Sequence, residues 1–440
     1  MSLPAWAGAA SAGAASAGAA WTRPAEIAAP TAISVVGPQI ASSTTGAAAV
    51  AFNEVNVDAQ AIGAAFLALA PPHGGFGGAQ QVPGTQEILA IAFSGRTLDL
   101  LVASGPPGQA CCSQAQIIRR GPSSRFGPPR TLVTGVGGGA TGRLVPLENG
   151  RMLAVIAGPE RLWVSEAGRS GRFGAARGLT PTGVAPAALA VTGTDGGGAM
   201  LAWTQGGSQG RVVAASAGPG ATPSRARVLF SLAAGHTVDG LQLVPRPGGV
   251  TLAWTESHSD GVGGYHARAM AADLTNPGRR GRVRALSAPT EVASALAVAG
   301  DGTGDEAAAW NACPTGTDAC VVKSAVRIGS GTRRGRSRRG RAPRAGARWF
   351  GPARSIGEID AGQSPQLTMA PDRASLLGWI TGRRVVLAGM PPSATRFGAP
   401  GAMSGDLADN LALGFGPTGQ AVAMWTQGTF ATAVLATVAR

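Results

Sequence analysis

The sequence predicts an all-β chain that repeats one unit of about fifty residues, and three observations predict it. A phrase ending in Trp and a polar residue returns as GAMLAWTQ, GVTLAWTE, EAAAWN and QAVAMWTQ. A phrase centred on Phe-Gly returns as RFGPPRTL, RFGAARGL, WFGPARSI and RFGAPGAM, with a weaker GFGGAQQV. No apolar pattern with the helical period is sustained, whereas short runs of Val, Leu, Ala and Trp bounded by turns occur throughout.

Within a well-preserved unit, an apolar segment, a tight turn and the Trp strand are followed by a third apolar segment and the Phe-Gly strand, which predicts four strands. The first turn carries residues that adopt positive φ at low cost, such as Asn149-Gly150, Asp195-Gly196 and Asp301-Gly302. The approximate spans of the eight units are 37–84, 85–136, 140–181, 184–233, 238–288, 292–358, 362–404 and 407–440. Seven units is the alternative, if 85–136 or 140–181 is irregular.

The last unit indicates how the array closes, because it lacks a Phe-Gly strand. The segment WTRPAEIAA from Trp21 has the spacing of FGPPRTLVT from Phe126, with an aliphatic residue six positions after the aromatic one. Pairing this segment with the last unit would leave no exposed terminal repeat. We therefore expect a β-propeller of eight four-stranded blades, in which an N-terminal strand completes the last blade.

These motifs resemble the β-propeller superfamily, in a divergent form similar to the Trp and Phe-Gly repeats of secreted bacterial propellers, which include sialidase-like and WD-repeat-like members. The resemblance covers residues 21–440 and implies one propeller domain. The Trp-Asp pairing of WD repeats, the double Gly of kelch repeats and the Asp-box of sialidases are all missing from the sequence. The resemblance therefore implies a fold and no particular activity.

The composition, with 44% hydrophobic and 14% charged residues, excludes a disordered chain. The net charge of +14 owes much to one segment within 329–348, which has no apolar anchor and which we expect to be a disordered insert. A solvated insertion is the simpler interpretation. The functional alternative is contact with a polyanion, through guanidinium groups that include Arg333, Arg334, Arg336, Arg338, Arg339 and Arg341.

The four cysteines fall into two pairs. Cys313 and Cys320 flank a short loop after a Trp strand, so antiparallel pairing would bring them opposite each other as a disulfide. Cys111 and Cys112 are adjacent, and we expect two thiols there because a vicinal disulfide is strained. A disulfide in the hairpin favours an oxidising compartment.

Residues 1–20 are small and apolar, with sites that resemble a signal-peptide cleavage site but without a basic start. We expect a flexible leader or a weak signal peptide, and a secreted or cell-surface protein. No later stretch has the length and apolarity of a membrane span. We further expect a monomer.

The fifth unit holds the sharpest cluster of reactive side chains. Glu256, His258 and Asp260 alternate along one strand, and His266 returns after a glycine turn. If the hairpin places His266 opposite His258, these groups offer nitrogen and oxygen ligands for a divalent metal ion. The interpretation we favour is a solvated polar loop without a cofactor.

Polar residues recur just after the Trp strand or its equivalent, at one end of the ring. They could hydrogen-bond a glycan or peptide, or serve contacts at the blade ends, and they are Asn53, Glu54, Gln205, Glu256, Asn311 and Gln427. The aromatic residues of the Trp strands are expected to pack between blades instead, and they are Trp203, Trp254, Trp310, Trp379 and Trp425.

Two functions remain open from the sequence. The first is a non-catalytic binding module that presents a loop-built face to a protein or a glycan. The alternative is a glycan-active hydrolase or lyase centred on the loop from Glu256 to His266. Because no catalytic motif is recognisable, enzymatic activity is the less favoured of the two.

Overall fold

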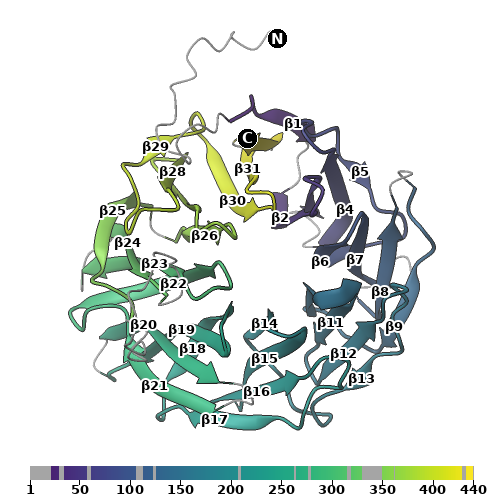
Figure 1. Ribbon diagram of the computed structural model, residues 1–440, viewed down its shortest axis with the longest axis horizontal. Helices are drawn as coiled ribbons and strands as arrows, with labels where there is room; N and C mark the ends of the chain where they lie inside the picture. The colour runs from purple at the N-terminus through teal and green to yellow at the C-terminus, as the bar shows by residue number, and fades with distance from the viewer. Residues whose placement is uncertain are drawn as a thin grey trace, which may run out of the picture.

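The computed structural model describes residues 21–28, 34–56, 61–105, 112–121, 125–206, 210–261, 264–275, 279–314, 319–329, 349–360, 362–428 and 433–439. These residues form eight antiparallel sheets of four strands each, arranged in a ring (Figure 1). The chain is therefore an eight-bladed β-propeller, and the fold predicted from the repeats is confirmed. The seven-blade alternative is wrong, because both weakly marked units form complete sheets.

The first four blades follow the chain order, with each strand paired to the next. Blade 1 contains β2 (Ser34–Ser42), β3 (Ala48–Asn56), β4 (Ala61–Ala70) and β5 (Gln80–Gln81). Blade 2 contains β6 (Glu87–Ser94), β7 (Thr97–Ser104), β8 (Gln114–Arg120) and β9 (Arg130–Thr134). Blade 3 contains β10 (Thr141–Pro146), β11 (Met152–Ala157), β12 (Leu162–Ala167) and β13 (Arg177–Gly178). Blade 4 contains β14 (Leu189–Thr194), β15 (Gly198–Gln205), β16 (Arg211–Ala217) and β17 (Arg227–Ser231).

The next three blades repeat this plan, and the eighth combines the two ends of the chain. Blade 5 contains β18 (Thr237–Arg246), β19 (Gly249–Ser259), β20 (Tyr265–Thr275) and β21 (Arg279–Ala285). Blade 6 contains β22 (Glu291–Gly300), β23 (Glu306–Pro314), β24 (Cys320–Arg327) and β25 (Arg354–Ile359). Blade 7 contains β26 (Gln366–Met369), β27 (Ser375–Thr381), β28 (Arg384–Met390) and β29 (Gly401–Ala402). Blade 8 contains β30 (Ala408–Phe415), β31 (Ala421–Gln427), β32 (Ala433–Ala439) and β1 (Ala25–Ala28).

Pairing of β1 with β32 closes the ring, as the spacing after Trp21 predicts (Figure 1). Ala25 lies opposite Ala436 in this antiparallel pair. Beside the pair, the Thr437 hydroxyl donates a hydrogen bond of 2.6 Å to the Thr22 carbonyl. The last blade therefore gains its fourth strand from the other end of the chain.

The first strand of each blade lies innermost and contacts the first strands of neighbouring blades. In β2, β18, β22 and β30 this strand carries a β-bulge, with a residue at a φ of 50° to 61°: Gly37, Gly240, Ala295 and Asn410. Bulges of this kind redirect the side chains that follow them. After two of them, Gln39 and Gln242 donate to the backbone carbonyls of Ile88 and Leu296 in the next blade.

Buried aromatic rings fill the interfaces between blades. Each packs against the preceding blade, and the Trp residues are at most 1% exposed, as expected from the repeats: Trp203, Trp254, Trp310, Trp379 and Trp425. Phe52 holds the equivalent place between blades 8 and 1. Two residues of the Phe-Gly phrases pack in the same clusters as these rings, Phe350 with Trp310 and Phe397 with Trp379. Phe173 packs in the corresponding cluster between blades 2 and 3. The repeated sequence thus reflects a repeated interface.

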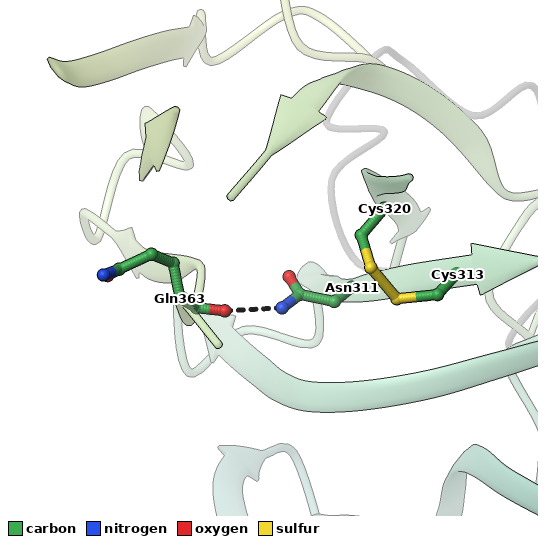
Figure 2. Close-up of a disulfide and its surroundings, with 4 residues drawn as sticks. All are labelled: Asn311, Cys313, Cys320 and Gln363. Carbon is green, nitrogen blue, oxygen red and sulfur yellow. Dashed lines mark hydrogen bonds between the residues drawn. A yellow bond between two sulfur atoms is a disulfide. The ribbon is translucent and has the colours of Figure 1, made fainter. Parts of the chain in front are cut away.

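The loop between β23 and β24 is closed by the predicted disulfide, Cys313–Cys320, with its Cα atoms 4.2 Å apart (Figure 2). The expectation of a free thiol at Cys112 is wrong, because Cys112 is also disulfide-bonded. Cys111, residues 1–20 and the arginines predicted to contact a polyanion lie outside the described residues. Within the described ranges the single helical element is the 3-10 turn Glu148–Gly150. It is too short to cross a membrane, and no other helix of the described residues could do so.

A buried ionic network joins blades 5 and 6 at the end of the ring that carries the first hairpin turns. Arg327 donates to Asp273 at 2.8 Å and to Glu306 at 3.4 Å, and the Thr251 hydroxyl donates to Glu306 at 2.7 Å. Glu306 is fully buried, and this burial raises its pKa to about 7, although the hydrogen bond from Thr251 and the charge of Arg327 both act to lower it. The Glu306 carboxyl group is therefore mostly neutral in the folded state at pH 6.

We predict that Glu306→Gln flattens the dependence of stability on pH. Because the pKa is raised on folding, the stability linked to this group is complete below its ordinary value of 4.5 and is lost as pH rises through about 7. Between pH 5 and 8 the wild-type free energy of unfolding should fall by about 2–3 kcal/mol more than that of the variant. Urea unfolding at both pH values measures this, with the exposed Glu160→Gln as control. Equal pH slopes for wild type and Glu306→Gln would contradict the assignment.

Candidate functional site

The residues predicted as a metal-binding cluster lie at one end of blade 5, where two strands extend beyond their counterparts. β19 and β20 are each 11 residues long, whereas the equivalent β15 and β16 have 8 and 7. Their register places His258 opposite His266. Because alternate residues share a face, Glu256 and His258 project from the same face as Trp254, toward blade 4.

Three imidazole rings form a stacked row at this place. The ring centres of His236 and His258 lie 4.3 Å apart at an angle of 6°, and those of His258 and His266 lie 5.0 Å apart at 19°. We call these three residues the histidine row. His236 was missed in the sequence because it lies on a different strand connection, just before β18. The signal that would have found it is the pairing of Thr237 with Ser257, because the same register brings His236 beside His258.

A carboxylate lies at each end of the histidine row. The Glu256 Oε1 atom is 2.7 Å from His236 Nδ1, and the Asp260 Oδ2 atom is 3.5 Å from His266 Nε2. Asp260 also accepts a hydrogen bond of 2.8 Å from the Gly264 amide, which fixes the turn. When Nδ1 of His236 carries the proton and donates to Glu256, its Nε2 atom is left as an acceptor.

A pocket of about 530 Å³ lies at the end of blade 4, two residues before His236, and is lined by Gly206, Arg211, Ser231, Leu232 and Ala234. Its wall and the row belong to one turn, in which the His236 amide donates to the Ala233 carbonyl at 3.1 Å. Tyr265, the chain's one tyrosine, begins β20 directly before His266 and is 53% exposed, so it projects from the opposite face of the strand. An arginine, imidazoles and carboxylates are thus gathered at one edge.

The described residues contain no group of three or more His, Cys, Asp or Glu side chains arranged to hold a metal ion. The stacking explains this geometry, since rings in parallel planes do not direct their nitrogen atoms to one point. Glu256, His258, Asp260 and His266 are therefore brought together, but as a row rather than as a ligand shell.

The six polar residues predicted to form a ring divide into two sets on opposite faces of their strands. Gln205, Glu256 and Gln427 follow the Trp by two residues, and Glu54 follows Phe52 in the same way. Gln205 and Gln427 accept hydrogen bonds from the indole nitrogens of Trp203 and Trp425, at 3.0 and 3.3 Å. Partial burial raises the pKa of Glu54.

Asn53 and Asn311 follow the aromatic residue directly and point to the other face. Asn53 accepts from the Ile88 amide at 2.8 Å and donates to the Ile88 carbonyl at 3.3 Å, in the next blade. Asn311 donates to the Gln363 carbonyl at 2.5 Å, just before blade 7 (Figure 2). Both side chains are less than 5% exposed, so their hydrogen bonds connect neighbouring blades.

No family model matches the sequence, and no curated protein matches it. Solved structures do match at the level of the fold. The Dos1 propeller is 7% identical, with a TM-score of 0.51, over 91% of this chain and 92% of that chain. An ulvan lyase of polysaccharide lyase family PL25, solved with -[GlcA(1-4)Rha3S]- bound, is 9% identical, with a TM-score of 0.50, over 80% of this chain and 93% of that chain. These likenesses show the propeller fold alone.

We predict that Asn53→Ala destabilises the protein by about 1–3 kcal/mol, because it removes both hydrogen bonds to Ile88 and leaves that buried backbone unpaired. Chemical denaturation measures the change. The control is the exposed Thr222→Ala, which should change stability by less than about 0.5 kcal/mol. An Asn53→Ala protein as stable as the control would show that Asn53 does not connect the blades.

Proposed function

We propose that this protein is a glycan-binding module, and that the glycan binds between the ends of blades 4 and 5, at the pocket and the histidine row. The one observation that carries the proposal is that the turn lining a pocket of about 530 Å³ leads directly into a row of stacked imidazoles. Sugar-sized pockets that combine flat rings with a few polar groups suit a ligand rich in hydroxyl groups.

The chemistry of the site supports a glycan over an apolar small molecule. Arg211 donates hydrogen bonds, Glu256 and Asp260 accept them, and an imidazole does both. The ulvan lyase with the same fold acts on a polysaccharide, which is consistent with this class of ligand.

A second function rests on the contact of His236 with Glu256. A carboxylate that holds one imidazole nitrogen, while the other can accept a proton, is the arrangement of a general base. A lyase or hydrolase acting on the same glycan would use this pair, with His258 near the reacting bond. We place this second because the sequence carries no recognisable catalytic motif around the pair.

We also propose that the protein is secreted or exposed at the cell surface. The Cys313–Cys320 disulfide supports an oxidising environment, which is where a polysaccharide ligand would be met.

A glycan array with purified full-length protein tests the proposal. We predict selective binding that weakens at least tenfold in His258→Ala, since the row loses the contact surface of its central ring. The control is His73→Asn, which changes the one histidine outside the row and keeps a residue that tolerates its φ of 61°. Thermal unfolding of each variant separates lost binding from lost folding.

The same samples separate the two functions. Release of new reducing ends or unsaturated uronate from the bound glycan, abolished in Glu256→Ala, would establish the enzyme. Binding without products would establish the module. Absence of glycan binding, or equal binding by all variants, would refute both and leave a protein ligand to be sought.

A further inference from the structure

A second surface lies on the outer edge of the ring, separate from the histidine row, where the fourth strands of blades 4, 5 and 6 follow one another (Figure 1). These strands, β17, β21 and β25, have the sequences RVLFS, RRGRVRA and RSIGEI, with one carboxylate among them, Glu358. We call the exposed arginines along this edge, together with Arg396 of blade 7, which lines the same pocket as Arg354, the arginine rim: Arg227, Arg280, Arg282, Arg284, Arg354 and Arg396. None of them forms an ion pair with a carboxylate of the described residues.

A register shift in β21 spreads its arginines to both sides of the blade. Arg284 pairs with Ala271, which packs toward blade 6, whereas Arg280 pairs with Leu274, which packs toward blade 4. Each guanidinium lies over an aromatic ring of the neighbouring blade. Arg280 is 5.3 Å from the centre of Phe230, and Arg284 is 4.9 Å from that of Trp349. Cation–π contacts thus hold these charges at the seams between blades and leave their hydrogen-bond donors unused by carboxylates.

A pocket of about 230 Å³ continues this edge between blades 6 and 7. Arg354, Thr395 and Arg396 supply donors to it, and Trp349 lines its wall. Two guanidinium groups and a hydroxyl around a small volume suit a sulfate or carboxylate group, which arginine binds through paired hydrogen bonds.

We propose that the arginine rim binds an acidic polysaccharide, with sulfate or carboxylate groups along the seams and one of them in the pocket between blades 6 and 7. A flexible chain can follow the curved outer edge of three blades, as a flat lipid surface cannot. Nucleic acid is less suited, because arginines already cover the rings of Phe230 and Trp349 on which bases would stack.

The test compares two full-length variants that each lose three positive charges. The rim variant is Arg282→Gln, Arg354→Gln and Arg396→Gln, which leaves both cation–π contacts in place. The control variant is Arg23→Gln, Arg96→Gln and Arg169→Gln, at exposed positions away from the rim. Dextran sulfate and polygalacturonate are the probes, neutral dextran is the blank, and affinity is measured from 50 to 200 mM NaCl.

We expect the rim variant to bind at least one acidic probe about tenfold more weakly at 150 mM NaCl, with a slope of log affinity against log salt reduced by about two. The control should stay within about twofold of wild type. Equal losses in both variants, or no binding to either acidic probe, would overturn the proposal. Rim-dependent binding that is tighter for poly(U) or for phosphatidylserine vesicles than for both probes would also overturn it. Glycan-array binding by the rim variant reports separately on the histidine row.

Discussion

The burial of one large aromatic ring between a blade and the blade before it, which recurs at six of the eight interfaces, is the interaction on which most of the ring depends. The Trp residues of blades 4 to 8 and Phe52 of blade 1 are fully or almost fully buried in this way. Removing such a ring from a core typically costs about 3–5 kcal/mol. Because the contact always connects adjacent blades, stability is distributed around the ring, and the loops at its ends are free to vary. That division explains why the architecture is repeated while the histidine row occurs at blade 5 only.

The sequence was sufficient for the fold because the repeated aromatic positions report the repeated interface. The unit spans, the closing strand after Trp21 and the Cys313–Cys320 disulfide all follow from local spacing, and all are confirmed. The candidate site was less predictable. His236 joins it only through the pairing of β18 with β19, which a single-strand pattern does not reveal. Asn53 and Asn311 were grouped with residues two positions after an aromatic residue, although a shift of one residue reverses the face.

Blade 5 departs most from the average unit, and its departures concern both surfaces. At one end, the lengthened hairpin of β19 and β20 carries the histidine row. At its outer edge, β21 carries four arginines in seven residues. Between blades 5 and 6, Glu306 and Arg327 are buried together, although replacing such pairs with apolar residues is often neutral or stabilising. The chain thus concentrates its polar and ionic groups around one blade of a ring whose other interfaces are mainly apolar.

The closing of the last blade by β1 also has a consequence for the order in which the protein can form. The hydrogen bond between Thr22 and Thr437 connects residues 415 positions apart. During synthesis, blades 1 to 7 can assemble in sequence from neighbouring segments, but β1 is made before every other strand of the ring and its partner β32 after them. The ring therefore stays open, with β1 unpaired, until β32 has been made. Contacts of such long range form slowly, and the edge of β1 has no partner for all that time.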